Sequence, residues 1–221
     1  MSSTAHRKTV MLLTAVLASG AVTAGSLTTT ASAAPGGNLT MRGKIVKKAV
    51  GEKNNAHHNR EARKNCNFYS GYWKTSGDNI CSTSTGGVKW RSNEWCADFA
   101  RYVWKKSGAK TSKIDPFAGS FYRAAKAGTG KWHPRGSYTP KPGDAVVYDW
   151  DGSSPSVGRN GWDIDHVGLV VKYRKSGKKL TTIEGNTTKK ASGGGKEGVY
   201  ERTRHNTKSG RVVGYISPEK R

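Results

Sequence analysis

Acidic residues are scarce in this sequence of 221 residues, which has 15 Asp and Glu against 38 Lys and Arg. The formal net charge is therefore +23, and an excess of that size indicates an anionic partner. Nucleic acid, anionic lipid and acidic cell-wall polymer all have the required charge, so the charge alone does not choose among them. The sequence shows no recognised nucleic-acid-binding motif and no internal repeat.

Long apolar runs are also missing, and the one apolar stretch lies near the N-terminus. Residues 9–24 carry no charge, but Ser, Thr and Gly dilute them, whereas a membrane-spanning helix needs roughly 18 or more strongly apolar residues. A basic start at residues 6–8 and a small-residue cleavage site at residues 31–33 complete the pattern of a secretory signal peptide. We therefore expect residues 1–33 to be a signal peptide. The mature protein is then secreted, extracellular or cell-wall associated, with no membrane attachment after cleavage.

Cysteine is rare as well, with residues at positions 66, 81 and 96 only. Thiols outside the cell tend to pair, and an odd number leaves at least one unpaired in a monomer, which is the state we expect. Cys66 and Cys81 flank a segment rich in Gly, Ser, Asn and aromatic residues, the kind of loop that a disulfide holds in place. We predict a Cys66–Cys81 disulfide and a free Cys96.

Aromatic residues, by contrast, make up 9% of the chain and include seven Trp, which argues against a fibrous or fully disordered protein. Residues 34–65 carry eight basic side chains against Glu52 and Glu61 and lack a core-forming period. They are predicted to form a basic, flexible arm, in which residues 44–50 could form a short helix. Residues 66–221 concentrate the aromatic and β-branched side chains, and we predict one domain there.

The clearest helix of this domain is predicted over residues 93–107. Ser92 or Asn93 can cap its start, and four apolar residues fall on one face: Trp95, Phe99, Tyr102 and Val103. Cys96 then lies in the first turn, where unsatisfied N–H groups and the helix dipole favour a thiolate. The alternative is a small buried core residue, because free cysteine is among the most buried residue types.

Strands are predicted at residues 145–148, 164–171, 180–183, 198–204 and 211–217. Alternation along the second of them places His166 and Gly168 on one face, so that Gly168 leaves space beside the imidazole. Glu184 and Asn186 are two residues apart, so both side chains can point to one face and reach a histidine on a neighbouring strand. A nucleophilic thiol needs a base, and the base needs a polar partner that orients it, and all these groups are present.

Four short motifs, at residues 94–100, 142–146, 165–168 and 183–186, resemble those of the CHAP family of cysteine- and histidine-dependent amidohydrolases and peptidases. The chain is similar in particular to secreted actinobacterial members. The resemblance implies a papain-like α+β fold, in which a helix that carries the cysteine packs on an antiparallel β-sheet. It assigns residues 66–221 to a CHAP-type hydrolase domain and implies cleavage of amide bonds in peptidoglycan, by an N-acetylmuramoyl-L-alanine amidase or a peptide endopeptidase.

By this resemblance Cys96 is the nucleophile and His166 the general base. Glu184 matches the acidic residue that orients the histidine, and Asn186 is the additional polar member of the catalytic group. Many family members have Gln directly before the nucleophile, where this chain has Trp95, so the side-chain part of an oxyanion hole is not identified by the motif. Three residues near the nucleophile are candidates for contact with substrate: Trp95, Asn93 and Asp98. Asn93 is a candidate second oxyanion donor, and Asp98 could instead be a first-turn acid that interacts with the helix dipole.

We expect no cofactor and no metal. The acidic pairs at residues 149 and 151 and at 163 and 165 are few for a hard cation, which takes six or more oxygen ligands, and short Asp pairs commonly form turns. The expected partners are peptidoglycan and anionic cell-wall polymers, with no specific nucleic acid. Two alternatives stay open, namely a non-catalytic basic protein that binds the wall and a secreted nucleic-acid-binding protein.

Overall fold

The computed structural model describes residues 38–77, 80–190 and 194–221, and Asn38–Arg221 form one compact unit. The predicted signal peptide, residues 1–33, lies outside the described residues. Within the described ranges, none of the helices has both the length and the apolar character that crossing a bilayer requires.

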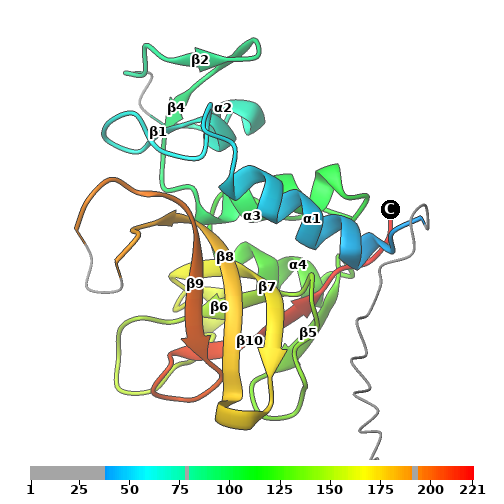
Figure 1. Ribbon diagram of the computed structural model, residues 1–221. Helices are drawn as coiled ribbons and strands as arrows, with labels where there is room; N and C mark the ends of the chain where they lie inside the picture. Colours follow the sequence, from blue (N-terminus) through cyan, green and yellow to red (C-terminus); the bar gives the residue numbers. More distant parts are fainter. Residues whose placement is uncertain (1–37, 78–79, 191–193) are drawn as a thin grey trace, which may run out of the picture. The chain divides into compact units, whose positions relative to one another are not determined.

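A six-stranded antiparallel sheet is the centre of the fold, with strand order β5-β10-β6-β7-β8-β9 (Figure 1). Its strands are β5 (Lys131–Pro134), β6 (Ala145–Tyr148), β7 (His166–Arg174), β8 (Lys179–Thr187), β9 (Gly198–His205) and β10 (Val212–Ser217). All five strands predicted from alternation are present, and β6 has the predicted bounds. The sheet and its helices confirm the expected α+β class.

In the part of the chain that the structure describes, four α-helices accompany the sheet: α1 (Met41–Lys53), α2 (Phe68–Trp73), α3 (Cys96–Lys106) and α4 (Ser120–Lys126). Two short 3-10 turns, Arg159–Gly161 and Ser176–Lys178, lie in connections. Two small two-stranded sheets complete the fold: β1 (Cys66–Asn67) pairs with β4 (Arg91–Ser92), and β2 (Ser84–Thr85) pairs with β3 (Val88–Lys89).

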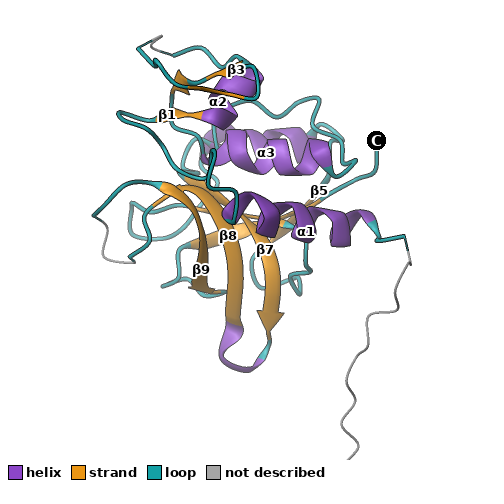
Figure 2. Ribbon diagram, turned by 45° about the horizontal axis from the view of Figure 1, so that its top comes forward, coloured by secondary structure: helices purple, strands orange, loops and turns teal. Residues whose placement is uncertain are grey.

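Helices α1 and α3 lie side by side over strands β7 and β8 (Figures 1 and 2). The larger hydrophobic core fills the space between these helices and the sheet, and β7 contributes Val167 and Leu169 to it. The opposite face of the sheet has a smaller core that includes Tyr148 and Val170. The odd and even residues of β7 therefore face different cores, as alternation predicts.

The predicted flexible arm over residues 34–65 is wrong from residue 41 onward, because α1 is packed into the domain. Ile45 and Ala49, one turn apart, have no exposed surface. The polar side chains of α1 also find partners in the domain. Arg42 contacts the buried Asp144 at 2.6 Å, and Glu52 accepts a hydrogen bond from the Tyr69 hydroxyl at 2.9 Å. Two buried apolar side chains and polar contacts with the buried groups Asp144 and Tyr69 hold a helix whose composition is otherwise that of a solvated segment.

Helix α3 begins three residues later than predicted. Its N-cap is Trp95, which makes no side-chain capping hydrogen bond, so the prediction of Ser92 or Asn93 as the cap is wrong. Ser92 belongs to β4 and pairs with Cys66 of β1, which keeps this part of the chain extended. Consequently Cys96 is the first residue of the helix.

Candidate active site

Cys96 occupies the N-terminus of α3, at the boundary between the helices and the sheet. Cys66 and Cys81 form a disulfide with a Cα–Cα distance of 5.7 Å, which confirms the predicted pairing and leaves Cys96 as a free, buried thiol. The first N–H groups of a helix have no partner within the helix, and the dipole is positive at this end. This position is well suited to stabilise negative charge on the sulfur, or on an oxygen that develops next to it.

His166 is the first residue of β7 and lies opposite Tyr148 of β6 in the strand register. Its ring is 7% exposed and lies 5.9 Å from the ring of Trp150. Burial lowers the pKa of His166, but hydrogen bonds with Cys96 and Glu184 outweigh burial and raise that pKa to about 9. The imidazolium form is therefore favoured at neutral pH.

Glu184 of β8 is fully buried, and its Oε2 lies 3.1 Å from Nε2 of His166. Thr182 and Arg204 donate to the same carboxylate, Thr182 Oγ1 at 2.6 Å and Arg204 Nε and Nη2 at 3.0 and 2.5 Å. Burial raises the pKa of Glu184, yet the hydrogen bonds from His166 and Arg204 outweigh it and hold that pKa well below its ordinary value. The carboxylate is thus an ionised anchor for the imidazolium.

Gly168 provides space in this group, although not in the way that we expected. A Cβ atom at position 168 would lie 2.7 Å from Cγ of Glu184, closer than two such atoms can approach. The missing side chain therefore makes room for Glu184 on the neighbouring strand. The expectation that it leaves space beside the imidazole is corrected accordingly.

Asn186 does not share the hydrogen bonds of His166. A register shift between Glu184 and Thr187 and a φ of 54° at Asn186 turn this residue out of the strand alternation. Its Nδ2 donates to the carboxylate of Glu94, and its Oδ1 is buried without a partner among the described residues. The alternation argument fails here because a bulge reverses the direction of the side chain.

Of the three candidate substrate contacts near Cys96, two are buried by the protein itself. Trp95 has no exposed surface and stacks on Tyr69. Asp98 also has none, and its carboxylate accepts hydrogen bonds from three buried side chains: Ser70, Thr75 and Arg101. The predicted substrate contact is therefore wrong for Trp95 and Asp98, because a fully buried side chain presents no surface to a ligand. The Asn93 amide is partly exposed and donates to the carbonyl of Glu94 at 2.7 Å.

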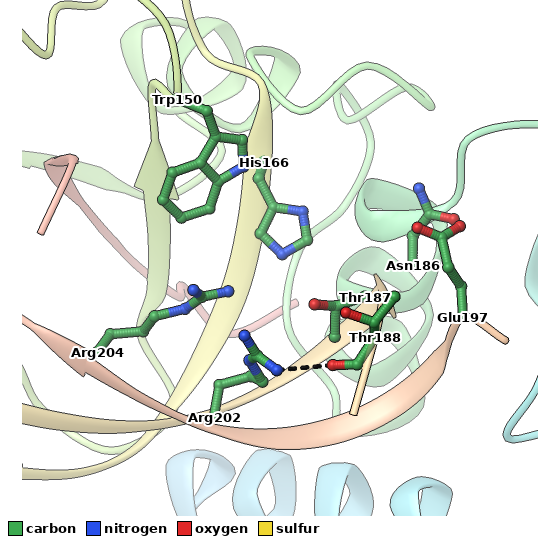
Figure 3. Close-up of a pocket in the computed structure, with 8 residues that line it drawn as sticks. All are labelled: Trp150, His166, Asn186, Thr187, Thr188, Glu197, Arg202 and Arg204. Atoms are coloured by element: carbon green, nitrogen blue, oxygen red, sulfur yellow. Dashed lines mark hydrogen bonds between the residues drawn. The ribbon is translucent and has the colours of Figure 1, made fainter. Parts of the chain in front are cut away.

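A pocket of about 390 Å³ opens beside His166 (Figure 3). Its walls come from the loop after β6, the start of β7, the end of β8, and β9 with the residue before it. They consist of Trp150, His166, Asn186, Thr187, Thr188, Glu197, Arg202 and Arg204. Figure 3 shows the guanidinium groups of Arg202 and Arg204 on one side and Glu197 beside Asn186 on the other. Sequence analysis missed both arginines. The two arginines lie at the site only because β9 pairs with β8, and no local sequence pattern reveals that pairing.

The Asp pairs noted in the sequence lie in the loop that precedes β7. Single carboxylate oxygens of Asp149, Asp151 and Asp165 lie within 4.8 Å of one another. Asp149 contacts Arg211 at 3.2 Å, and Asp165 accepts a hydrogen bond from the Trp150 amide at 2.6 Å. The Asp165 carboxylate raises the pKa of Asp151. These contacts are those of carboxylates that shape a loop.

One comparison with known proteins gives a match. The family model of the CHAP domain matches residues 87–186, which include Cys96, His166 and Glu184. Neither the curated proteins nor the solved structures contain a match to the chain. Strand β9, with Arg202 and Arg204, lies beyond the matched residues.

Proposed function

Because residues 87–186 of this chain belong to the CHAP domain family, we propose that the protein is a secreted cysteine hydrolase that cleaves amide bonds in bacterial peptidoglycan. The observation that carries this proposal is the buried His166–Glu184 pair, 3.1 Å apart, whose imidazole also interacts with the free thiol of Cys96 at the start of α3. Acyl transfer by a thiol requires these three kinds of group, a nucleophile, a base and an acid that orients the base. The activity is that of an N-acetylmuramoyl-L-alanine amidase or of a peptide endopeptidase.

The first half of the reaction forms a covalent acyl-enzyme. The thiol proton resides on His166, and the Cys96 sulfur attacks the carbonyl carbon of the amide. The backbone N–H of Cys96, at the N-terminus of α3, donates to the oxygen that becomes negative. The C–N bond then breaks, and the His166 imidazolium gives its proton to the leaving amine.

The second half releases the acid product. His166, now neutral, takes a proton from water, and the resulting hydroxide attacks the thioester that links the acyl group to Cys96. The carbon–sulfur bond breaks, and the sulfur leaves as thiolate. Throughout both halves Glu184 orients the imidazole ring, and Arg204 and Thr182 hold the carboxylate of Glu184 in place.

Export is supported by two observations. The Cys66–Cys81 disulfide fits an oxidising compartment, where such bonds persist. The large positive charge suits the anionic polymers of a bacterial wall. We place the protein outside the cell or in the wall for these reasons.

The decisive experiment compares wild type with Cys96→Ala and His166→Ala on purified cell walls. We expect both variants to lose lysis and to keep wall binding, because only the reacting groups are removed. His205→Ala is the matched control, since His205 is an exposed histidine at the end of β9. Lysis by Cys96→Ala would overturn the proposal, and wall binding without lysis by the wild type would favour a non-catalytic wall-binding protein. Mass spectrometry of the fragments distinguishes an amidase from an endopeptidase.

A further inference from the structure

Arg202 of β9 is a buried cation that the catalytic group does not use. It pairs with Thr182 in the β8–β9 register, and Thr182 donates to Glu184, so Arg202 lies on the sheet face of the catalytic acid. The side chain lines the pocket beside His166 (Figure 3). Residue 202 is only 8% exposed, which is unusual for an arginine without an ionic partner.

The hydrogen bonds of Arg202 leave most of its guanidinium unused. Nη1 donates to the backbone carbonyls of Thr188 and Lys189, at 2.7 and 3.1 Å. Within residues 38–77, 80–190 and 194–221, no carboxylate pairs with Arg202, and neither Nε nor Nη2 has an acceptor. A guanidinium has five N–H donors, so a flat pair of donors remains available to a ligand.

The neighbouring Arg204 differs from Arg202 in that its guanidinium already has a carboxylate partner. Its Nε and Nη2 already bind the two oxygens of Glu184, so its fork is occupied by the protein's own carboxylate. Arg202 has the same kind of fork without such a carboxylate. Burial, and next the charge of Arg204, lower the pKa of Arg202, as expected for a cation that lacks compensation.

The pocket as a whole gives a ligand one orientation. Arg202 and Arg204 occupy one side, and Glu197 lies beside Asn186 on the other (Figure 3). An anionic group is therefore attracted to the arginine side and repelled from the opposite one.

We propose that Arg202 binds a free carboxylate of the wall peptide close to the amide bond that Cys96 attacks, which makes it a specificity-determining residue for acidic over amidated peptidoglycan. Guanidinium and carboxylate match as a planar pair with two parallel hydrogen bonds. A carboxamide at the same place presents one N–H₂ group to these donors and carries no charge. The inference rests on the proposed function, because it takes the wall peptide as the ligand.

The test uses soluble wall fragments in two forms. One form is mock-treated and is called untreated below, and the other is amidated with ammonia and a carbodiimide. We expect wild type to show kcat/KM at least about tenfold higher for the untreated fragments, which is the factor for a 1.4 kcal/mol difference in binding. Arg202→Gln should lose this preference. Its kcat/KM for both forms should equal the wild-type value for the amidated fragments. Arg202→Lys keeps the charge without the fork and should show an intermediate preference. Lys172→Gln, at an exposed position of β7, is the matched control and should behave as wild type.

Binding to Cys96→Ala separates this inference from the proposed function. In that variant the untreated fragments should bind at least about tenfold more tightly than the amidated ones, and the added Arg202→Gln change should remove the difference. Equal binding of both forms to Cys96→Ala, or a preference that survives Arg202→Gln, would overturn the carboxylate site. A wild type that cleaves neither form, while Cys96→Ala binds with the expected preference, refutes the hydrolase and leaves the site intact. The thermal midpoint of each variant shows whether it is folded.

Discussion

The protonation of His166 is the property of a single residue that most directly controls the proposed reaction. Its pKa is about 9 in the folded protein, against about 6.5 for an unperturbed histidine. The folded-state value is the higher one, so the protonated ring stabilises the fold fully below pH 6.5. That contribution is lost as pH rises through 9.

We therefore predict that kcat/KM falls on the alkaline side with an apparent pKa near 9, as the imidazolium that protonates the leaving amine disappears. Glu184→Gln removes the carboxylate that stabilises this charge. It should move the alkaline limb to lower pH and reduce kcat/KM by about 100-fold or more.

The measurement is the pH dependence of fragment cleavage, with Glu201→Gln as control. Glu201 is an exposed glutamate on β9 whose partner is Lys53. Loss of the Glu201 carboxylate should therefore leave the pH of the alkaline limb unchanged. An alkaline limb that stays at the same pH in Glu184→Gln would contradict the role of Glu184.

The sequence singles out the residues of the proposed reaction, but it does not reveal their surroundings. Cys96, His166 and Glu184 are recognisable because acyl transfer needs those chemical types, and each lies in a strong local pattern. Arg204 and Arg202 become visible only when β9 pairs with β8, which depends on long-range contacts. Asn186 shows a related limit, because one bulge reverses what a period of two predicts.

At the level of the elements, the contact between α3 and β8 sets the position of Cys96, the proposed nucleophile, relative to the sheet that carries His166. Gly185 of β8 lies against this helix, where a Cβ atom would come within 2.6 Å of Cβ of Phe99 and 2.9 Å of the Trp95 ring. Both neighbours are fully buried and have no room to move. The absence of one side chain therefore allows the helix N-terminus to approach the strand.

We predict that Gly185→Ala pushes α3 away from β8 and lowers kcat by at least about tenfold, with a loss of stability of about 1–3 kcal/mol from overpacking. Gly51→Ala is the matched control, because a Cβ atom at position 51 of α1 meets nothing within 4 Å. Alanine is the better helix former, so that variant should be more stable by about 0.5–1 kcal/mol. Cleavage rates and denaturant unfolding of both variants check the prediction, which an unaltered kcat in Gly185→Ala would contradict.

The start of α3 shows how an element boundary escapes local analysis. The periodicity of residues 93–107 identifies the helix correctly, and standard capping preferences then favour Ser92 or Asn93. The β1–β4 pairing takes Ser92 into a strand, and the Cys66–Cys81 disulfide holds the segment that begins at β1. Tertiary pairing thus overrides a capping preference that is worth about 1 kcal/mol.

For the molecule as a whole, the docking of α1 changes where the domain begins. Composition alone suggests a solvated arm, since the helix is rich in lysine, yet its partners lie about 100 residues away in Asp144 and in strands β7 to β9. Such contacts cannot be seen in a local window. The positive charge of this helix is consequently carried on the body of the domain.

The docking of α1 on the domain leads to a prediction about stability. Ile45→Ala should reduce the free energy of unfolding by about 2–5 kcal/mol, because Ile45 is completely buried in the main core. Val46→Ala, at the adjacent and half-buried position, is the control and should have a smaller effect. Denaturant unfolding distinguishes the two, and an unchanged midpoint for Ile45→Ala would mean that α1 is an arm after all.

The place of β9 in the sheet has a consequence for how members of the CHAP family can diverge. β9 is the last strand of the six-stranded sheet, and it lies outside the matched residues 87–186. The nucleophile and the base of the proposed reaction, Cys96 and His166, are thus encoded in one stretch of the gene, and the arginine that would select the substrate is encoded in another. Under the proposed function, a mutation or recombination event that replaces Arg202 would change which walls are attacked and would leave the reacting atoms unchanged.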